Sequence, residues 1–516
     1  MSDTPNFENI QGDIWPGLSK RYQEFWFFQI HDPDAFKPSL RKLADEVITS
    51  AADALNDKKA IHQAKASASD RDHELAGVNI AFSNKGMDKL SKSGFRDDPF
   101  LKGMEADMVN EGRDRAEDWI DEFKVGEDKQ GGVDGVLLVC GTESMVKDTV
   151  SELAYKYLSS KQGIRHLLTL DGRERPGAHK GHEHFGFLDA ISQPKLKGFD
   201  NPPQKGDGNY QYLTRPGIIL IGHDGELNNE EKFQHPGWAK DGSYLVIRKL
   251  RQLVPEFNDY LKSEAPKLHL NEGQLGARLL GRWKSGAPVE LHPQDDCTED
   301  ARLNEFDYSP TSHTNCPFAS HMRKVKPRSL VSNRDMNDIM RRGIPYGPEV
   351  GVNETKTERD RGLLFTCYQS SISNGFQFLK RSWINMDTFP PGKTRYTGGT
   401  NPGQDAIIGQ LVKNPQKEKH KILTTSLVDG KGQNTTTSFL PFIQANGGDY
   451  FFTPSLQLLR DMSGQPAPGK IEQRSEPLPE QRSEQRLEQR SEQRSEHEGF
   501  FSQFGHGVQN IADQIF

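Results

Sequence analysis

Residues 314–328 combine one histidine with a dense group of cations. His321 comes first, and four cations follow it: Arg323, Lys324, Lys326 and Arg328. A neutral imidazole is a good ligand for iron, and cationic side chains bind the carboxylates of a bound group. A run of charge is also typical of a solvated surface loop. The segment alone therefore leaves a metal site and a bland basic loop both open.

A carboxylate in apolar surroundings is the second candidate. Asp189 lies in the segment His182-Glu-His-Phe-Gly-Phe-Leu-Asp-Ala-Ile-Ser-Gln-Pro. Such a carboxylate is either a satisfied structural group or a group tuned for proton transfer. His182 and His184 are candidate ligands, although histidines in polar loops more often bind no metal.

The third candidate is a pair of arginines among Gly and Pro turns. Arg341 and Arg342 stand in Asp338-Ile-Met-Arg-Arg-Gly-Ile-Pro-Tyr-Gly-Pro-Glu-Val, with Tyr346 close behind. Either this is a loop with an exposed salt bridge, or an arginine is fixed there to stabilise charge on a bound oxygen species.

Composition limits what these candidates can belong to. A chain of 516 residues holds more than one core unit. The net charge of −7 argues against a nucleic-acid binder. The four cysteines (Cys140, Cys297, Cys316 and Cys367) are scattered without a CxxC spacing, so the sequence implies neither a disulfide framework nor a zinc site.

The order of the predicted elements indicates an α+β fold. Strands at 22–31, 77–82 and 135–141 alternate with helical patterns at 34–56, 99–124 and 145–161, which favours a ferredoxin-like sandwich. A related order begins again with strands at 216–222, 242–250 and 361–369 and helices at 254–262 and 374–385. We therefore predict two ferredoxin-like units, 1–205 and 206–462, with a long insertion in the second.

The segment 463–516 differs in composition from the rest of the chain. It repeats Glu-Gln-Arg-Ser with a period of four, which places like charges at i, i+4 and weakens a helix. We predict a disordered tail with a short apolar end.

The beginning of the chain has no basic n-region and no apolar h-region, so as written it is not a secretory signal. An intracellular enzyme, a secreted mature form and unconventional export all stay open. No run approaches the roughly 18 apolar residues of a membrane span, and we expect no membrane partner.

Together the three candidate stretches resemble the dye-decolorizing peroxidases, in particular the fungal-type members, over roughly residues 7–460. The resemblance rests on six motifs in order: Asn9-Ile-Gln-Gly-Asp-Ile, Gly186-Phe-Leu-Asp-Ala with Ser192-Gln-Pro, Gly281-Arg-Trp-Lys-Ser-Gly-Ala-Pro, Cys316-Pro-Phe-Ala-Ser-His-Met-Arg-Lys, Arg341-Arg-Gly-Ile-Pro-Tyr-Gly-Pro-Glu and Cys367-Tyr-Gln.

The resemblance implies one haem b per chain, bound between two ferredoxin-like units of the dimeric α+β barrel type. It implies these roles: His321 as proximal iron ligand, Asp189 as distal acid-base residue, Arg341 as distal arginine, Leu363 and Phe365 as apolar distal wall, and Arg323 as a propionate contact. The family motif GxxDG ends here in Ala190, which places the geometry of Asp189 in question.

The same resemblance implies oxidation by hydrogen peroxide, with Asp189 moving the proton and Arg341 stabilising the charge as the O–O bond breaks. Reductants would then lose one electron at a time. They could be dyes, phenols, other aromatic molecules or Mn²⁺. We expect a monomer or weak homo-oligomer that acts best in acid.

Two further expectations accompany this assignment. Bulky dyes would react at a surface aromatic, and Tyr346 and Trp383 resemble such relay positions, although a turn tyrosine and a core tryptophan are the alternatives. Two rival functions also stay open. One is a haem-thiolate enzyme with Cys316 as ligand, and the other is a non-catalytic haem-binding or haem-transfer protein.

Overall fold

The computed structural model describes residues 5–66, 76–110, 114–125, 132–202, 212–227, 234–333, 335–410 and 423–464. Within these ranges, no helix combines the length and apolar character needed to cross a membrane. Residue 205, at the predicted unit boundary, lies outside the described residues. So does the predicted tail beyond its first two residues, so both boundaries stay predictions.

The first half of the chain forms four antiparallel strands. They are β1 (Tyr22–Ile30), β2 (Gly77–Phe82), β3 (Gly135–Gly141) and β4 (Ile164–Arg173). Their spatial order is β4-β1-β3-β2, which is the order 4-1-3-2 of a ferredoxin-like unit. All nine residues of β1 are buried, so this strand, which is rich in aromatic side chains, is covered on both faces.

The second half repeats this plan. Its strands are β7 (Ser243–Gln252), β8 (Met340–Arg341), β9 (Ile344–Tyr346), β10 (Gly362–Gln369) and β13 (Ile443–Thr453). The spatial order β13-β7-β10-β8, with β9 also on β10, is again 4-1-3-2 when β8 and β9 count as one interrupted strand. Strand β13 also pairs with β2, so the two units share one nine-stranded sheet. The predicted fold class is confirmed.

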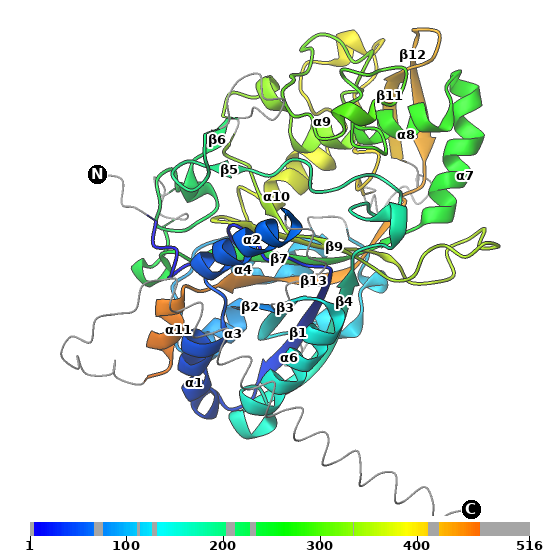
Figure 1. Cartoon of the computed structure of the whole chain (residues 1–516). Coiled ribbons are helices and arrows are strands. Elements are labelled where there is room, and N and C mark those ends of the chain that lie inside the picture. Colours follow the sequence, from blue (N-terminus) through cyan, green and yellow to red (C-terminus); the bar gives the residue numbers. More distant parts are fainter. Residues whose placement is uncertain are drawn as a thin grey trace, which may run out of the picture.

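Helices cover this sheet on both sides. They are α1 (Pro33–Lys42), α2 (Ala51–Ala66), α3 (Asn84–Lys89), α4 (Asp98–Lys102), α5 (Met104–Asn110), α6 (Glu143–Lys156), α7 (Val254–Glu264), α8 (Glu272–Leu280), α9 (His321–Val325), α10 (Phe376–Phe378) and α11 (Leu456–Met462). In Figure 1, α1, α6 and α11 lie below the sheet. Above it lie α7, α8, α9 and a hairpin of β11 (Leu423–Val428) and β12 (Asn434–Phe439).

The strand predicted at 216–222 is wrong. Pro216–Ile218 is a 3-10 turn, and Ile219 and Leu220 that follow it are fully buried without joining the sheet. A Cβ on Gly217 would lie 2.2 Å from the backbone nitrogen of Glu226, so the turn needs glycine there. Burial of an apolar run therefore does not by itself distinguish a strand from a tight turn.

Two small features complete the fold near the candidate site. A two-residue parallel pair joins β5 (Lys195–Leu196) to β6 (Leu213–Thr214). A π-helical turn, Leu379–Ile384, continues α10 and packs against α9. The predicted helix at 374–385 is thus present as a short α-helix followed by a wider turn.

Candidate active site

His321 is the first residue of α9, and a buried carboxylate fixes its ring. Its Nδ1 lies 2.9 Å from Oδ2 of Asp405, which is fully buried. The backbone N–H groups of Ile407 and Ile408 donate to Oδ1 of the same carboxylate at 2.8 and 2.9 Å. With Nδ1 donating to Asp405, the lone pair of Nε2 stays available, which is the arrangement of a metal-binding histidine.

The charge on Asp405 is kept by these same contacts. Burial by itself would raise the pKa of the carboxyl, but His321 and the two N–H donors hold that pKa below its ordinary value. Asp405 follows His321 by 84 residues, and sequence analysis did not find it. Asp307 and Glu349 are nearer to His321 in sequence than Asp405 is. They do not bind its ring, because Asp307 accepts from Ser329 and Glu349 from Arg175.

Asp189 lies in the loop between β4 and β5. Its Oδ1 accepts hydrogen bonds from the N–H of Ala190 at 2.6 Å and from Nη1 of Arg341 at 2.9 Å. Burial alone would raise the pKa of Asp189, but Arg341, the Ala190 N–H and His321 together hold that pKa below its ordinary value. Because His321 contributes to this shift, the imidazole and the carboxylate are close enough to interact electrostatically.

Arg341 belongs to β8 and reaches back to the Asp189 loop. Its backbone N–H donates to Oε1 of Gln193 at 3.0 Å, and Nη2 donates to the carbonyl of Ser192 at 3.1 Å. The side chains of Arg341 and Asp189 are 31% and 33% exposed. The structure thus brings these two predicted residues together and leaves about a third of each side chain exposed.

Leu363 and Phe365 share a sheet face with Arg341. In the ladder between β8 and β10, Arg341 stands opposite Cys367. Residues that stand opposite each other point to the same face, and so do residues two apart on one strand. Leu363 and Phe365 are both half-buried, so they supply an apolar surface beside the Asp189–Arg341 pair.

The cations after His321 were predicted either to bind the carboxylates of a bound group or to lie in a solvated loop. The structure differs from both predictions. Arg323 is fully buried, and its guanidinium donates to the carbonyls of Ser309, Ser312 and Cys316. It therefore presents no exposed donor to a propionate, contrary to its expected role. Residues 301–320, which precede α9, form neither helix nor strand, so their carbonyls need hydrogen-bond donors from side chains.

Lys324 is buried as well. Its Nζ donates to the carbonyls of Trp383 and Met386 at 2.9 and 2.6 Å, and burial lowers the pKa of this lysine to about 7. Arg328 donates to the carbonyls of Asn304 and Phe306. The solvated-loop interpretation of these side chains is therefore wrong, because they stabilise irregular backbone.

The two proposed relay aromatics are not surface residues. Tyr346 and Trp383 are each 7% exposed. The hydroxyl of Tyr346 donates to Oδ1 of Asp360 at 2.9 Å, and Trp383 stacks on Phe389 with ring centroids 5.0 Å apart. A surface position is thus excluded for both, and Trp383 matches the alternative of a core residue.

The other sulfur and nitrogen candidates have structural partners. Cys316 is fully buried, its Sγ lies 3.0 Å from Oγ of Ser320, and burial raises the pKa of its thiol to about 11. A protonated thiol is a poor iron ligand. His184 is buried with its Nε2 2.8 Å from the carbonyl of Tyr346, and burial lowers its pKa to about 4.

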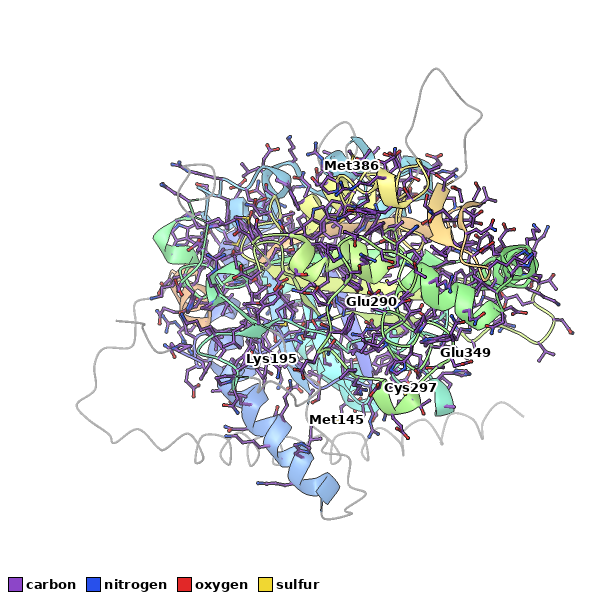
Figure 2. The ribbon with its side chains drawn as sticks, turned by 90° about the horizontal axis from the view of Figure 1, so that it is seen from above. Met145, Lys195, Glu290, Cys297, Glu349 and Met386 are labelled. Carbon is purple, nitrogen blue, oxygen red and sulfur yellow. The ribbon has the colours of Figure 1, made fainter. Side chains whose placement is uncertain are left out.

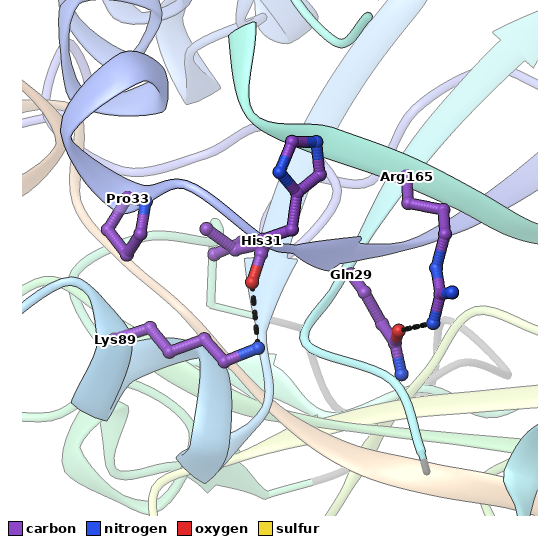
Figure 3. Close-up of a pocket in the computed structure, with 6 residues that line it drawn as sticks. Gln29, His31, Pro33, Lys89 and Arg165 are labelled. Atoms are coloured by element: carbon purple, nitrogen blue, oxygen red, sulfur yellow. Dashed lines mark hydrogen bonds between the residues drawn. The ribbon is translucent and has the colours of Figure 1, made fainter. Parts of the chain in front are cut away.

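A cavity of about 530 Å³ lies elsewhere, at the end of β1. Figure 3 shows that its cations are engaged by neighbouring groups. Lys89 donates to the carbonyl of Ile30 at 2.8 Å, and Arg165 donates to Gln29. None of the predicted site residues lines this cavity.

Comparisons with known proteins agree with this arrangement. The family model described as "DyP dimeric alpha+beta barrel domain" matches residues 9–176, and the one described as "Dyp-type peroxidase, C-terminal" matches residues 223–393. Dye-decolorizing peroxidase msp1 of Mycetinis scorodonius is 37% identical over 482 residues, covering 88% of this chain and 87% of that protein. For dye-decolorizing peroxidase AauDyP1 of Auricularia auricula-judae the identity is 34%, covering 88% and 86%.

Solved structures give the same result. An ancestral D-type dye decolorizing peroxidase superposes with a TM-score of 0.78 at 40% identity, covering 89% of this chain and 99% of that one. A dye-decolorizing peroxidase in complex with 2,6-dimethoxyphenol superposes with a TM-score of 0.75 at 35% identity, covering 89% and 100%. These matches define a peroxidase with a dimeric α+β barrel domain. The chain belongs to the dye-decolorizing peroxidase family, and its curated relatives include several fungal members.

The backbone conformation at position 190 explains why the family motif carries glycine there. Ala190 has φ of +56°, in the left-handed region, and its side chain is exposed. A residue with a Cβ pays about 1–2 kcal/mol for this conformation. The alanine therefore keeps the carboxylate of Asp189 in place but strains the turn.

We predict that Ala190→Gly raises the free energy of unfolding by about 0.5–1 kcal/mol, because the relief of strain exceeds the added entropy of the unfolded chain. Chemical denaturation measures the change. The control Ala60→Gly, in the middle of α2, should lower stability by about the same amount. A loss of stability in Ala190→Gly would contradict the assigned strain.

Proposed function

We propose that this peroxidase would bind haem b through Nε2 of His321 and that Asp189 and Arg341 would act on hydrogen peroxide. The observation that carries the proposal is that both the candidate iron ligand and the candidate acid-base residue have a charged partner that holds them in place. Asp405 orients His321, and Arg341 holds Asp189. A non-catalytic haem carrier would need only the first pair, so the second favours catalysis.

The residues present fit a haem group. His321 has one nitrogen held by Asp405 and a side chain that is still 21% exposed, as a ligand of the haem iron would require. Leu363 and Phe365 offer half-buried apolar atoms for the macrocycle. When bound, haem b would supply the redox chemistry, taking two oxidising equivalents from peroxide and passing them on one electron at a time.

The protein's own groups would manage protons and charge. The ionised carboxylate of Asp189 takes a proton from one oxygen of hydrogen peroxide and gives it to the other oxygen, which leaves as water. Arg341 stabilises the negative charge that develops as the O–O bond breaks. We propose phenols and related aromatic molecules as reductants, because a structural relative is described in complex with 2,6-dimethoxyphenol.

Replacing the proposed base should separate catalysis from haem binding. Asp189→Asn keeps the shape of the side chain but cannot take the proton, so we expect peroxide-dependent oxidation of 2,6-dimethoxyphenol to fall by about 10²–10⁴-fold. Haem content, read from the absorption spectrum, should not change. Asp171→Asn, an exposed carboxylate on β4, should behave like the parent. Full activity in Asp189→Asn with normal haem content would refute the assigned role.

The pH profile tests the charge pairing. Asp189 acts as a base only when ionised, so the rate with peroxide should fall as pH drops through its pKa, which lies below the ordinary value of about 3.9. Arg341→Leu removes the first of the groups that lower this pKa. The acid limb of kcat/KM should therefore move to higher pH, and the maximum rate should drop by about 10²–10³-fold.

Arg341→Lys is the matched control, because it retains a positive charge without the planar guanidinium. Its acid limb should lie between those of the parent and Arg341→Leu. An acid limb that stays at the same pH in all three proteins would show that another group titrates.

A further inference from the structure

Three potential metal ligands of different chemistry meet in the segment between α8 and α9, apart from the active site. They are His292, Cys297 and Asp300, and one ligand atom from each lies within 4.8 Å of the other two. Nε2 of His292 and Oδ2 of Asp300 are 2.7 Å apart. The spacing of the four cysteines did not indicate this site, because only Cys297 belongs to it and the other two ligands are a histidine and an aspartate of the same segment, 292–300.

The backbone around these ligands is held by neighbouring groups. Nε1 of Trp283 donates to the carbonyl of His292 at 2.7 Å, and Nε2 of Gln274 donates to the carbonyl of Gln294 at 2.9 Å. The N–H of Asp300 donates to the carbonyl of Cys297 at 3.1 Å, within a 3-10 turn. The backbone that carries the three side chains is thus held in place before any ion binds, which lowers the cost of ordering the site.

Solvent can reach this cluster, and its surroundings are acidic. Of the four cysteines, Cys297 is the one that is not buried, and Figure 2 shows it toward the edge of the molecule opposite Met386. The side chains of His292 and Asp300 are 27% and 38% exposed. Three exposed carboxylates share the segment: Asp295, Asp296 and Glu299. A cation approaching from solvent would therefore be attracted.

We propose that His292, Cys297 and Asp300 bind one divalent cation of the zinc type, with water as the fourth ligand. A thiolate selects against Ca²⁺ and Mg²⁺, whereas thiolate, imidazole and carboxylate together suit Zn²⁺. Tetrahedral bonds of about 2.0–2.3 Å separate ligand atoms by about 3.3–3.5 Å. Nε2 of His292 and Oδ2 of Asp300 would therefore move apart slightly from 2.7 Å as the ion replaces their hydrogen bond, and Sγ of Cys297 lies within 4.8 Å of both.

The cation would brace a segment that supports Asp189. On one side of the cluster, the carbonyl of Lys284 accepts the N–H of Leu188 at 3.1 Å. On the other side, Nδ2 of Asn304 donates to the carbonyl of Ile191 at 3.2 Å. The three ligands lie in sequence between Lys284 and Asn304, so a bound ion would cross-link the segment that holds the Asp189 loop through these two residues. The binding site itself does not depend on the proposed haem chemistry.

Zinc binding by the full-length holoenzyme tests the proposal. After dialysis against a chelator, titration with Zn²⁺ and elemental analysis should find about one tightly bound equivalent per chain. Cys297→Ser and His292→Ala should each weaken binding by more than about 100-fold, beyond the usual effect of losing a supporting contact. Asp295→Asn and Glu299→Gln each remove one negative charge but no ligand, so both variants should bind Zn²⁺ like the parent.

Alkylation of Cys297 gives a second measurement that does not depend on activity. Iodoacetamide should modify this thiol in the metal-free enzyme, and Zn²⁺ should slow the reaction at least tenfold in the parent but not in His292→Ala. Peptide mass spectrometry identifies the modified cysteine. Tight zinc binding that survives Cys297→Ser, or equal alkylation rates with and without Zn²⁺ in the parent, would overturn the proposal.

Discussion

The ion pair between Asp189 and Arg341 is the contact on which the proposed catalytic arrangement depends. It joins residues 152 positions apart, one in the loop after β4 and the other in β8. Because both side chains are about a third exposed, the pair adds about 1 kcal/mol or less to stability. Its importance is electrostatic, since Arg341 lowers the pKa of a partly buried carboxyl that burial alone would raise.

The opposite half of the site is built on irregular backbone, and this explains its buried cations. The residues before α9 form no ladder that could satisfy their carbonyls, so Arg323 and Arg328 donate to these backbone oxygens instead. Lys324 also ties α9 to the π-helical turn that contains Trp383. His321 is thereby presented by a fixed helix, while Asp405 fixes the rotation of its ring.

Sequence patterns predicted the two-unit fold because β1, β3, β7 and β10 are apolar runs whose order survives the long insertion. They also found Asp189 and Arg341, whose residue types stand out from their surroundings. Asp405 could not be found, because only the fold brings it to His321. The burial of Arg323 and Lys324 was missed for a related reason: charge in a sequence indicates solvent, whereas unpaired carbonyls appear only in three dimensions. The strand predicted at 216–222 failed because its apolar residues are buried in a turn.

The proposal that His321 binds the haem iron is tested most directly by the absorption spectrum of the ferrous carbonyl complex. Parent protein and Cys316→Ser should show the same histidine-type spectrum, since the Cys316 thiol is buried and burial raises its pKa to about 11. His321→Gly should lose that spectrum and regain it when imidazole is added. A thiolate-type spectrum in the parent that disappears in Cys316→Ser would contradict the assignment of His321 to the iron.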